Sequence, residues 1–320
     1  MFDPMSMHAH RTRREDTDRG PRVIVSPGVS EPPAILVRDL RKSYGDVDAV
    51  RGIDFDVARG EVFGLLGPNG AGKTTTVEIL EGYRNRTGGI VSVLGHDPAG
   101  RPRALRERTG IVLQSSGMYR YLTVREAVAH WAALYPRPRA VEEVIEVVGL
   151  QESAEVRVRR LSGGQARRLD LALALVGDPE LVFLDEPTTG FDPEARRAAW
   201  STVRALADLG KTILLTTHYL DEAQALCDRV GIVKDGRILA VGAPSEIGVD
   251  AASRYRIAWR DEHGDTHVRE TDDPTALLHQ LTSGALARGV PLRDLSVTRP
   301  SLEDVYLELT AEAEEEAGRV

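Results

Sequence analysis

The stretch from Gly67 to Thr75 has the residue types and the spacing of a phosphate-binding loop. It reads GPNGAGKTT, follows the apolar run EVFGLLG and leads into KTTTVEILEGY, so it joins an expected strand to an expected helix. Glycines let several backbone N–H groups point at one anion, and a helix N-terminus adds partial positive charge. Lys73 can reach the β- and γ-phosphates, and the Thr74 hydroxyl can bind Mg²⁺. We therefore expect a nucleotide site formed by Gly67, Asn69, Gly70, Gly72, Lys73, Thr74 and Thr75.

Two adjacent carboxylates end the apolar run LVFLDE at residues 181–186. Such a run predicts a strand buried on both faces, and ligands bind at the carboxyl ends of strands in open α/β sheets. Asp185 suits Mg²⁺, held through water. Glu186 is expected on the other side of the pleat, where it could hold an attacking water as general base. General-base help is worth roughly 10²–10⁴-fold in rate.

A second glycine pair, without a lysine, occurs in LSGGQ at residues 161–165. Ser162 can cap the helix predicted to follow it. The N–H groups of Gly163 and Gly164 would then point outward at the helix start, where they could meet a phosphate. A simple helix cap and a phosphate site use the same donors, so both interpretations stay open on the residues alone.

Short apolar or alternating runs predict the strands of the main domain, and apolar residues three or four apart predict its helices. The expected strands are ILVRDLRKSYG, GIDFDV, EVFGLLG, GGIVSVLG, TGIVLQ, LVFLDEP, KTILLTTH and the hairpin RVGIVKDGRILAVG, with its turn at Asp235-Gly236. The expected helices are KTTTVEILEGY, TVREAVAHWAALY, AVEEVIEVVGL, ARRLDLALALVG, PEARRAAWSTVRALADLG and YLDEAQALCD. This order predicts an α/β fold.

A second, smaller α/β unit is expected after the main domain. RYRIAWR alternates as a strand should, His263-Gly264 forms a turn, DPTALLHQL forms a short helix, PLRDLSVTRP forms a strand and PSLEDVYLELT forms a helix. We expect a disordered arm (1–33), a nucleotide-binding domain (34–245) with a helical subdomain at about 115–165, an accessory domain (246–312) and an acidic tail (313–320).

Composition restricts the class of protein. The chain of 320 residues has a formal net charge of −8, which disfavours non-specific nucleic-acid binding. Its one cysteine, Cys227, excludes a disulfide within the chain, and we expect that thiol to be buried. No run approaches the ~20 apolar residues of a membrane span, and the N-terminus lacks a signal-peptide core. We expect a cytoplasmic protein that meets a membrane only through a partner.

Together these motifs resemble the ATP-binding subunit of an ABC transporter, over roughly residues 35–245, and LSGGQ is the full form of that family's signature. The resemblance implies a P-loop NTPase fold with a β-subdomain and a helical insertion. It also implies that two cassettes pack head to tail around two ATP. Each ATP would touch the phosphate loop of one copy and the signature of the other, through Ser162, Gly163, Gly164 and Gln165.

Four further residues gain a role from the resemblance. Tyr44 matches the aromatic that stacks on adenine, and Gln114 matches the glutamine that joins the subdomains and senses Mg²⁺. His218 matches the histidine that contacts the γ-phosphate, and Asp192 the aspartate of the loop that crosses between subunits. Taken alone, Tyr44 could be a core tyrosine and His218 a structural histidine. Phe191 replaces the family's usual leucine, which leaves the local packing open.

One set of motifs in a chain without a membrane span implies a homodimer and a separate integral membrane permease. The phrases VEILEGYR and PSLEDVYLELT resemble antibiotic and multidrug export ATPases of the daunorubicin-resistance type. Related ATPases serve lipid, polysaccharide or peptide export, and these cargoes stay open. A soluble ABC ATPase without a transport role is a further alternative, against which the accessory domain argues. A non-catalytic regulatory subunit is another, against which Glu186, His218 and LSGGQ argue.

Overall fold

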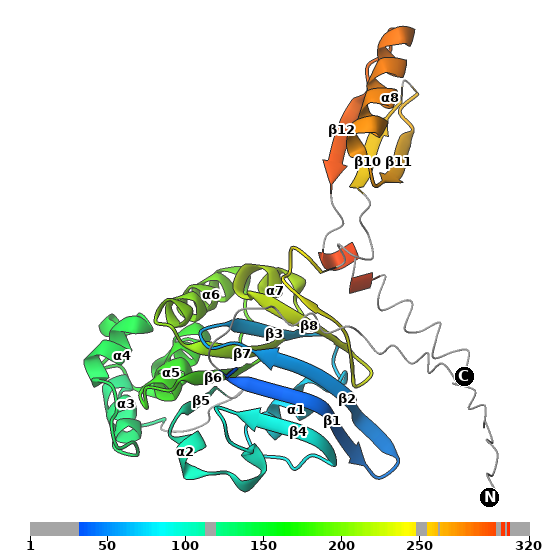
Figure 1. Ribbon diagram of the computed structural model, residues 1–320. Helices are drawn as coiled ribbons and strands as arrows, with labels where there is room; N and C mark the ends of the chain where they lie inside the picture. Colours follow the sequence, from blue (N-terminus) through cyan, green and yellow to red (C-terminus); the bar gives the residue numbers. More distant parts are fainter. Residues whose placement is uncertain are drawn as a thin grey trace, which may run out of the picture.

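The computed structural model describes residues 32–112, 120–247, 255–261, 263–298, 302–304 and 306–307. Most of the expected N-terminal arm, the acidic tail and Gln114 lie outside the described residues. Figure 1 shows a main body that contains the nucleotide motifs and a smaller group of elements near the C-terminus. In the described part of the chain, no helix is both long and apolar enough to cross a bilayer.

A six-stranded sheet forms the centre of the main body, in the order β5-β6-β7-β3-β8-β9. The strands β5, β6, β7, β3 and β8 are parallel, and β9 runs antiparallel to β8. Asp235 and Gly236, with φ of 49° and 76°, form the predicted hairpin turn between β8 and β9. The strand bounds are β3 Val62–Leu66, β5 Thr109–Val112, β6 Leu181–Asp185, β7 Thr212–Thr217, β8 Arg229–Lys234 and β9 Arg237–Gly242.

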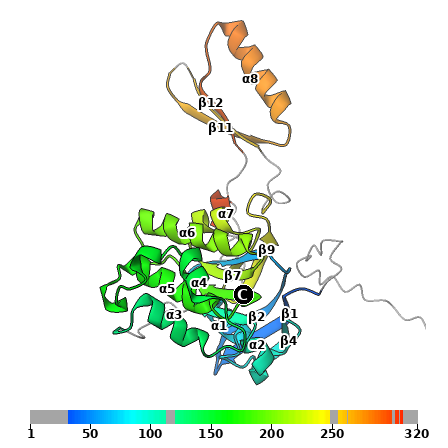
Figure 2. The ribbon, with the colours of Figure 1, turned by 90° about the vertical axis from the view of Figure 1, so that its left-hand side faces the viewer.

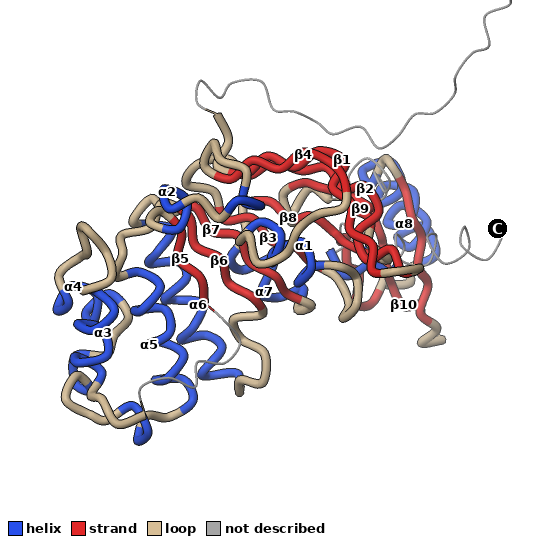
Figure 3. The backbone as a smooth tube through the Cα atoms, turned by 90° about the horizontal axis from the view of Figure 1, so that it is seen from below, coloured by secondary structure: helices blue, strands red, loops and turns tan. Residues whose placement is uncertain are grey.

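The two faces of this sheet bury different layers, as the alternation of β3 shows. Val62 and Leu66 pack in the cluster with the helices, whereas Phe63 and Leu65 pack with α1 and a second sheet. Figure 3 shows the helices α3 to α6 on one side and β1, β2 and β4 on the other. The helices of the first layer are α3 Val124–Ala132, α4 Val141–Val147, α5 Gly163–Leu175, α6 Pro193–Asp208 and α7 Leu220–Leu226.

The second layer is a three-stranded antiparallel sheet of order β2-β1-β4, with α1 between it and the central sheet. Buried Phe55 of this layer stacks on Phe63 of the central sheet, with ring centroids 5.4 Å apart. The bounds are β1 Ile35–Tyr44, β2 Val47–Val57, α1 Lys73–Leu80 and β4 Gly88–Val93, and a short helix, α2 Arg103–Arg106, precedes β5. The mixed α/β architecture therefore agrees with the predicted fold class.

A small unit of three antiparallel strands and one helix follows the main body (Figures 1 and 2). It comprises β10 Tyr255–Arg260, β11 Thr266–Thr271, α8 Pro274–Arg288 and β12 Arg293–Thr298. Ile257 and Trp259 are buried, as the alternation predicted. The helix is longer than the short one expected, because ALAR continues it until Gly289 ends it in the left-handed conformation, at φ 69°.

The segments on either side of this small unit pack on the main body. Ile247, before it, and Leu302, after it, are 7% and 2% exposed and belong to the apolar cluster of the central sheet and its helices. Tyr306 packs against the same cluster. Although the sequence assigned residues 246–312 to an accessory domain, both flanks of the small unit contribute to the core of the nucleotide-binding domain.

Candidate active site

The phosphate loop lies against the β8–β9 hairpin. A Cβ atom on Gly67 would overlap the carbonyl oxygen of Val233. Gly72 has φ 100°, and a Cβ there would lie 2.5 Å from the carbonyl oxygen of Ala49. The Gly236 N–H donates to the Ala71 carbonyl at 3.0 Å. Glycine is therefore required at two of the predicted positions by close backbone contacts as well as by the loop's curvature.

Lys73 lies inside the loop, with a side chain that is 4% exposed. Its ammonium group donates to the carbonyl oxygens of Gly67 and Pro68 at 2.7 and 3.0 Å and is 3.8 Å from Glu186 Oε1. Burial lowers the pKa of Lys73, while the charges of Glu186 and Asp185 act against that decrease. A cation is thus held where the loop and the carboxylates meet.

The remaining members of the loop face outward. Asn69, Gly70 and Thr74 are exposed and Thr75 is half-buried. The Thr74 hydroxyl therefore lies at an accessible side of the first turn of α1, next to buried Lys73.

The two carboxylates are organised by a threonine on the neighbouring strand β7. Thr216 Oγ1 donates to Asp185 Oδ1 at 2.6 Å and accepts from the Glu186 N–H at 2.9 Å. Glu186 has φ 45°, so the chain leaves the strand there and the expected alternation of the pleat does not describe its direction. The left-handed turn brings the Glu186 carboxylate to Lys73.

His218 follows β7 and completes this group. Its Nδ1 lies 3.4 Å from Glu186 Oε1, and this nitrogen is buried without a hydrogen bond among the described residues. The structure therefore brings together Lys73, Asp185, Glu186 and His218 from three different strand ends. A carboxylate between a lysine and a histidine can hold a water while the two nitrogens bind an anion.

Tyr44 lies at the surface, 40% exposed, so it is not a core tyrosine. The Lys42 ammonium and the Arg84 guanidinium lie 4.7 and 5.7 Å from the centre of its ring. Gln114 lies outside the described residues.

The LSGGQ segment starts helix α5. Ser162 is its N-cap, and Ser162 and Gln165 form a capping box. The Gln165 side chain also donates to Ser153 Oγ at 3.1 Å. A Cβ on Gly163 would meet nothing within 4 Å, so the helix N-terminus opens on free space. The cap that the sequence suggested is present, Gly163 is exposed and Gly164 is half-buried.

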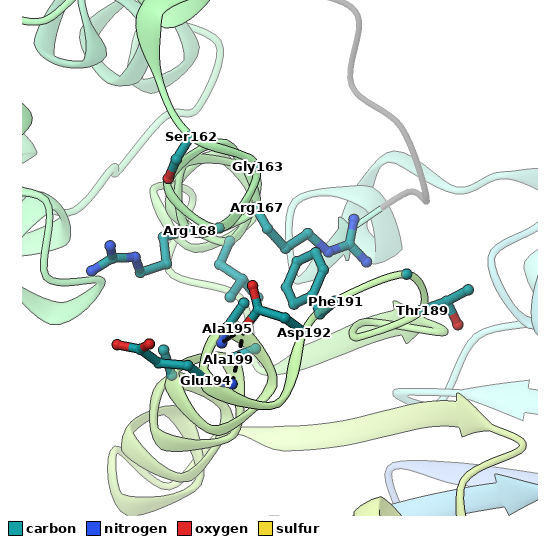
Figure 4. Close-up of a pocket in the computed structure, with 14 residues that line it drawn as sticks. Ser162, Gly163, Arg167, Arg168, Thr189, Phe191, Asp192, Glu194, Ala195 and Ala199 are labelled. Atoms are coloured by element: carbon teal, nitrogen blue, oxygen red, sulfur yellow. Dashed lines mark hydrogen bonds between the residues drawn. The ribbon is translucent and has the colours of Figure 1, made fainter.

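This helix start and the Asp192 loop line one pocket of about 510 Å³ (Figure 4). Ser162, Gly163 and Gly164 contribute one wall, and Phe191 and Asp192 contribute another. Asp192 Oδ1 accepts from the N–H groups of Glu194 and Ala195, so this carboxylate caps α6. In the part of the chain that the structure describes, no residue of the phosphate loop lines this pocket. The signature and Asp192 thus form a group separate from Lys73, Glu186 and His218.

The sequence did not reveal two residues close to the group of Lys73, Asp185, Glu186 and His218. Thr216 could have been found as a threonine at the carboxyl end of the strand before His218. Glu81 follows α1 and is only partly exposed. Its burial, and then the nearby charges of Asp185 and Glu78, raise its pKa to about 8. No sequence pattern marks that site, because its burial depends on the packing of α1.

Comparison with known proteins gives a consistent assignment. Residues 50–189 match the family model described as ABC transporter. The chain is 42% identical to the Nod factor export ATP-binding protein I of Burkholderia orbicola, over 85% of this chain and 95% of that protein. It is 37% identical to a daunorubicin resistance ATP-binding protein of Streptomyces coeruleorubidus, over 87% and 96%.

A solved structure agrees with this fold. CbiO1 from Clostridium perfringens, part of the ABC transporter complex cbiONQ, superimposes with a TM-score of 0.61 at 28% identity. The match covers 69% of this chain and 92% of that one. The chain therefore belongs to the ABC transporter family, as an ATP-binding subunit that hydrolyses ATP.

Proposed function

We propose that two copies of this chain pack head to tail around two ATP molecules and drive a separate membrane permease. The observation that carries this proposal is the separation of two complementary half-sites. Lys73, Glu186 and His218 form a cationic and basic group, whereas Gly163 and Gly164 lie at a helix start in another pocket, where their N–H groups can act as donors. Neither half-site surrounds a triphosphate by itself, and a head-to-tail pair would join one of each.

Each residue has a defined part in this proposal. Tyr44 stacks on adenine, the phosphate loop and Lys73 bind the phosphates, and Glu186 holds the attacking water as general base. His218 contacts the γ-phosphate from the same chain, and Asp192 belongs to the loop that crosses to the partner. The signature helix start, with Gln165 holding the Ser162 cap, stabilises the γ-phosphate of the partner's ATP.

Magnesium fits the oxygen donors of the first half-site. Asp185 is only partly exposed and is oriented by Thr216, and the Thr74 hydroxyl is accessible beside Lys73. Hard oxygen ligands of this kind are typical of Mg²⁺ bound with nucleotide phosphates. Thr74, Asp185 and Gln114 would hold the ion, which when bound neutralises phosphate charge. The charged groups of the chain then bind and orient the nucleotide.

ATP closes such a dimer because its γ-phosphate contacts donors of both chains. Hydrolysis and phosphate loss remove those contacts, and the dimer opens. The permease would convert this cycle into export, with the ATPase lying on the inner face of the membrane. The names of the relatives support export but cover two cargoes, Nod factor and daunorubicin. We propose a drug or antibiotic-like cargo; lipid, polysaccharide or peptide export is the alternative.

Complementation between two inactive chains tests the shared sites. Lys73→Ala removes the phosphate-binding cation. Gly163→Asp adds a carboxylate at a helix N-terminus that has room for it, which favours the helix but repels a phosphate. Each variant alone should lose turnover. A mixed dimer keeps one intact site, so an equal mixture should regain about a quarter of wild-type activity if pairing is random.

The complementation experiment needs two reference measurements. Glu186→Gln should be nearly inactive, and with ATP it should accumulate as a dimer in sedimentation. A mixture of Lys73→Ala with Glu186→Gln should gain much less activity, because both variants damage the same half-site. If the mixture of Lys73→Ala and Gly163→Asp is no more active than the variants alone, the shared-site proposal is wrong.

A further inference from the structure

A buried carboxylate outside the proposed catalytic group joins three elements of the site. Glu222, on α7, is 1% exposed. Its Oε1 accepts a hydrogen bond from the Thr188 hydroxyl at 2.8 Å and another from the Trp200 indole N–H at 3.1 Å. Thr188 is 0% exposed and lies in the loop between Glu186 and Asp192, while Trp200 is on α6. One oxygen atom therefore links the loop after β6, helix α6 and helix α7.

A second link joins the same helices one turn closer to the site. The Arg196 guanidinium, on α6, is 3.2 Å from Asp221 Oδ2 and lies 4.3 Å from the centre of the Tyr219 ring. Tyr219 in turn contacts His218, with ring centroids 4.1 Å apart. The start of α6, capped by Asp192, is thus fastened to the segment that carries His218.

Glu222 is hydrogen-bonded to the segment that connects the two half-sites. Glu186 and His218 belong to the group around Lys73, and Asp192 and Phe191 line the pocket of the signature. The residues 186–192 run from one group to the other, and Glu222 holds both this run, at Thr188, and the helix that follows it, at Trp200. A movement of Asp192 and α6 would therefore displace α7 and, through it, His218.

We propose that Glu222 is a positioning residue that couples the two ATP sites of the dimer. It holds Glu186 and His218 in a fixed position relative to Asp192 and α6. Glu186 and His218 act on the ATP of their own chain, whereas Asp192 and α6 contact the partner. This inference rests on the proposed function. Trp200 and Thr188 supply the donors, and a buried carboxylate deprived of them would lose its fixed position, because buried hydrogen bonds to charged groups are costly to leave unmade.

Conservative substitutions separate positioning from folding. Trp200→Phe keeps an aromatic ring and removes only the N–H donor, and Glu222→Gln keeps an oxygen that can accept both bonds. We expect Trp200→Phe to lower kcat about tenfold, with KM for ATP changed by less than about twofold. Glu222→Ala should act similarly, and Glu222→Gln should restore most of the rate. In the Glu222→Ala background, Trp200→Phe should have no further effect.

Arg204→Met provides the matched control, because Arg204 also links α6 to α7, donating to the Ala225 carbonyl at 2.9 Å, at an exposed position away from the site. This variant should keep the wild-type kcat. The inference fails if Trp200→Phe retains wild-type kcat, if it raises KM instead, or if Arg204→Met lowers kcat as much. These results would leave the proposed function intact, since complementation between Lys73→Ala and Gly163→Asp tests that separately.

Hydrogen exchange provides a readout that needs no turnover. ATP bound at the phosphate loop should slow amide exchange across residues 188–199 in the wild type, in Glu222→Gln and in Arg204→Met. In Trp200→Phe that protection should be lost while protection of the phosphate loop stays. Equal protection in all four chains would overturn the inference, whether or not the isolated chain hydrolyses ATP.

Discussion

Glu81 should make the stability of the protein depend on pH in a way that one substitution removes. The side chain follows α1 and is only partly exposed, and burial raises its pKa from 4.5 to about 8, with smaller effects from Asp185 and Glu78. A group whose pKa is higher in the folded state stabilises that state fully below its unfolded pKa. This stabilisation is lost as the pH rises through the folded pKa.

The size of the effect follows from the two pKa values. The pKa of Glu81 is 4.5 in the unfolded chain and about 8 in the folded one. Relative to a Glu81 that is ionised in both states, its protonation therefore stabilises the folded state by about 2.7 kcal/mol at pH 6 and by almost nothing at pH 9. Glu81→Gln resembles the protonated side chain at every pH. The full linkage, reached well below pH 4.5, is about 4.8 kcal/mol, so at pH 6 the variant should already be the more stable by about 2 kcal/mol, because Glu81 of the unfolded wild type is ionised there. At pH 9 the variant should be the more stable by about 4.7 kcal/mol, so its advantage should grow by about 2.7 kcal/mol between pH 6 and pH 9.

Urea unfolding followed by circular dichroism at pH 6 and 9, without nucleotide, measures this difference. The exposed residue Glu152 provides a control, because Glu152→Gln should change stability equally at both pH values. All other titrating groups are common to the compared chains and cancel. If the stability difference between wild type and Glu81→Gln is the same at pH 6 and pH 9, the buried environment assigned to Glu81 is wrong.

Three further predictions test local features of the fold. Gly67→Ala should lower the free energy of unfolding by about 1–3 kcal/mol in urea titrations and weaken ATP binding, because the new Cβ overlaps the Val233 carbonyl; wild-type values for both would contradict the close contact. Ser162→Ala should cost about 1 kcal/mol, measured in the same way, because it removes the N-cap of α5; an unchanged midpoint would mean that the cap contributes nothing. Asp97→Asn should lose less stability than the wild type between pH 4 and pH 2. The Arg86 guanidinium lowers the pKa of Asp97 to about 2, and the stabilisation from this pair disappears as the pH falls through that value. Parallel acid-unfolding curves for the two chains would refute this prediction.

The sequence predicted the phosphate loop and its lysine because their chemistry is local. A glycine-rich turn between a strand and a helix needs no information from elsewhere in the chain. The proximity of Lys73 to Glu186 also followed, since both were expected at carboxyl ends of strands in one sheet. The direction of Glu186 did not follow, because its left-handed φ of 45° is imposed by the turn after β6 and by Thr216.

The contacts that the sequence did not reveal join elements far apart in the chain. Glu222 meets Thr188 and Trp200 only because α6 and α7 pack side by side over the sheet. Nothing in the spacing of these residues marks the pairing. The burial of Glu81 and the return of Leu302 to the main body depend in the same way on packing between distant segments.

The return of Leu302 has a consequence for how the protein is made. Ile247 leaves the ribosome 55 residues before Leu302, and the small unit is synthesised between them. At about 5–20 residues per second, the part of the apolar cluster that Leu302 joins stays uncovered for roughly 3–11 seconds after Ile247 has been added to the chain. The growing chain therefore completes the core of its ATP-binding domain only after the small unit has been synthesised. A chain that ends within the small unit would leave the apolar side chains that Leu302 covers exposed to solvent.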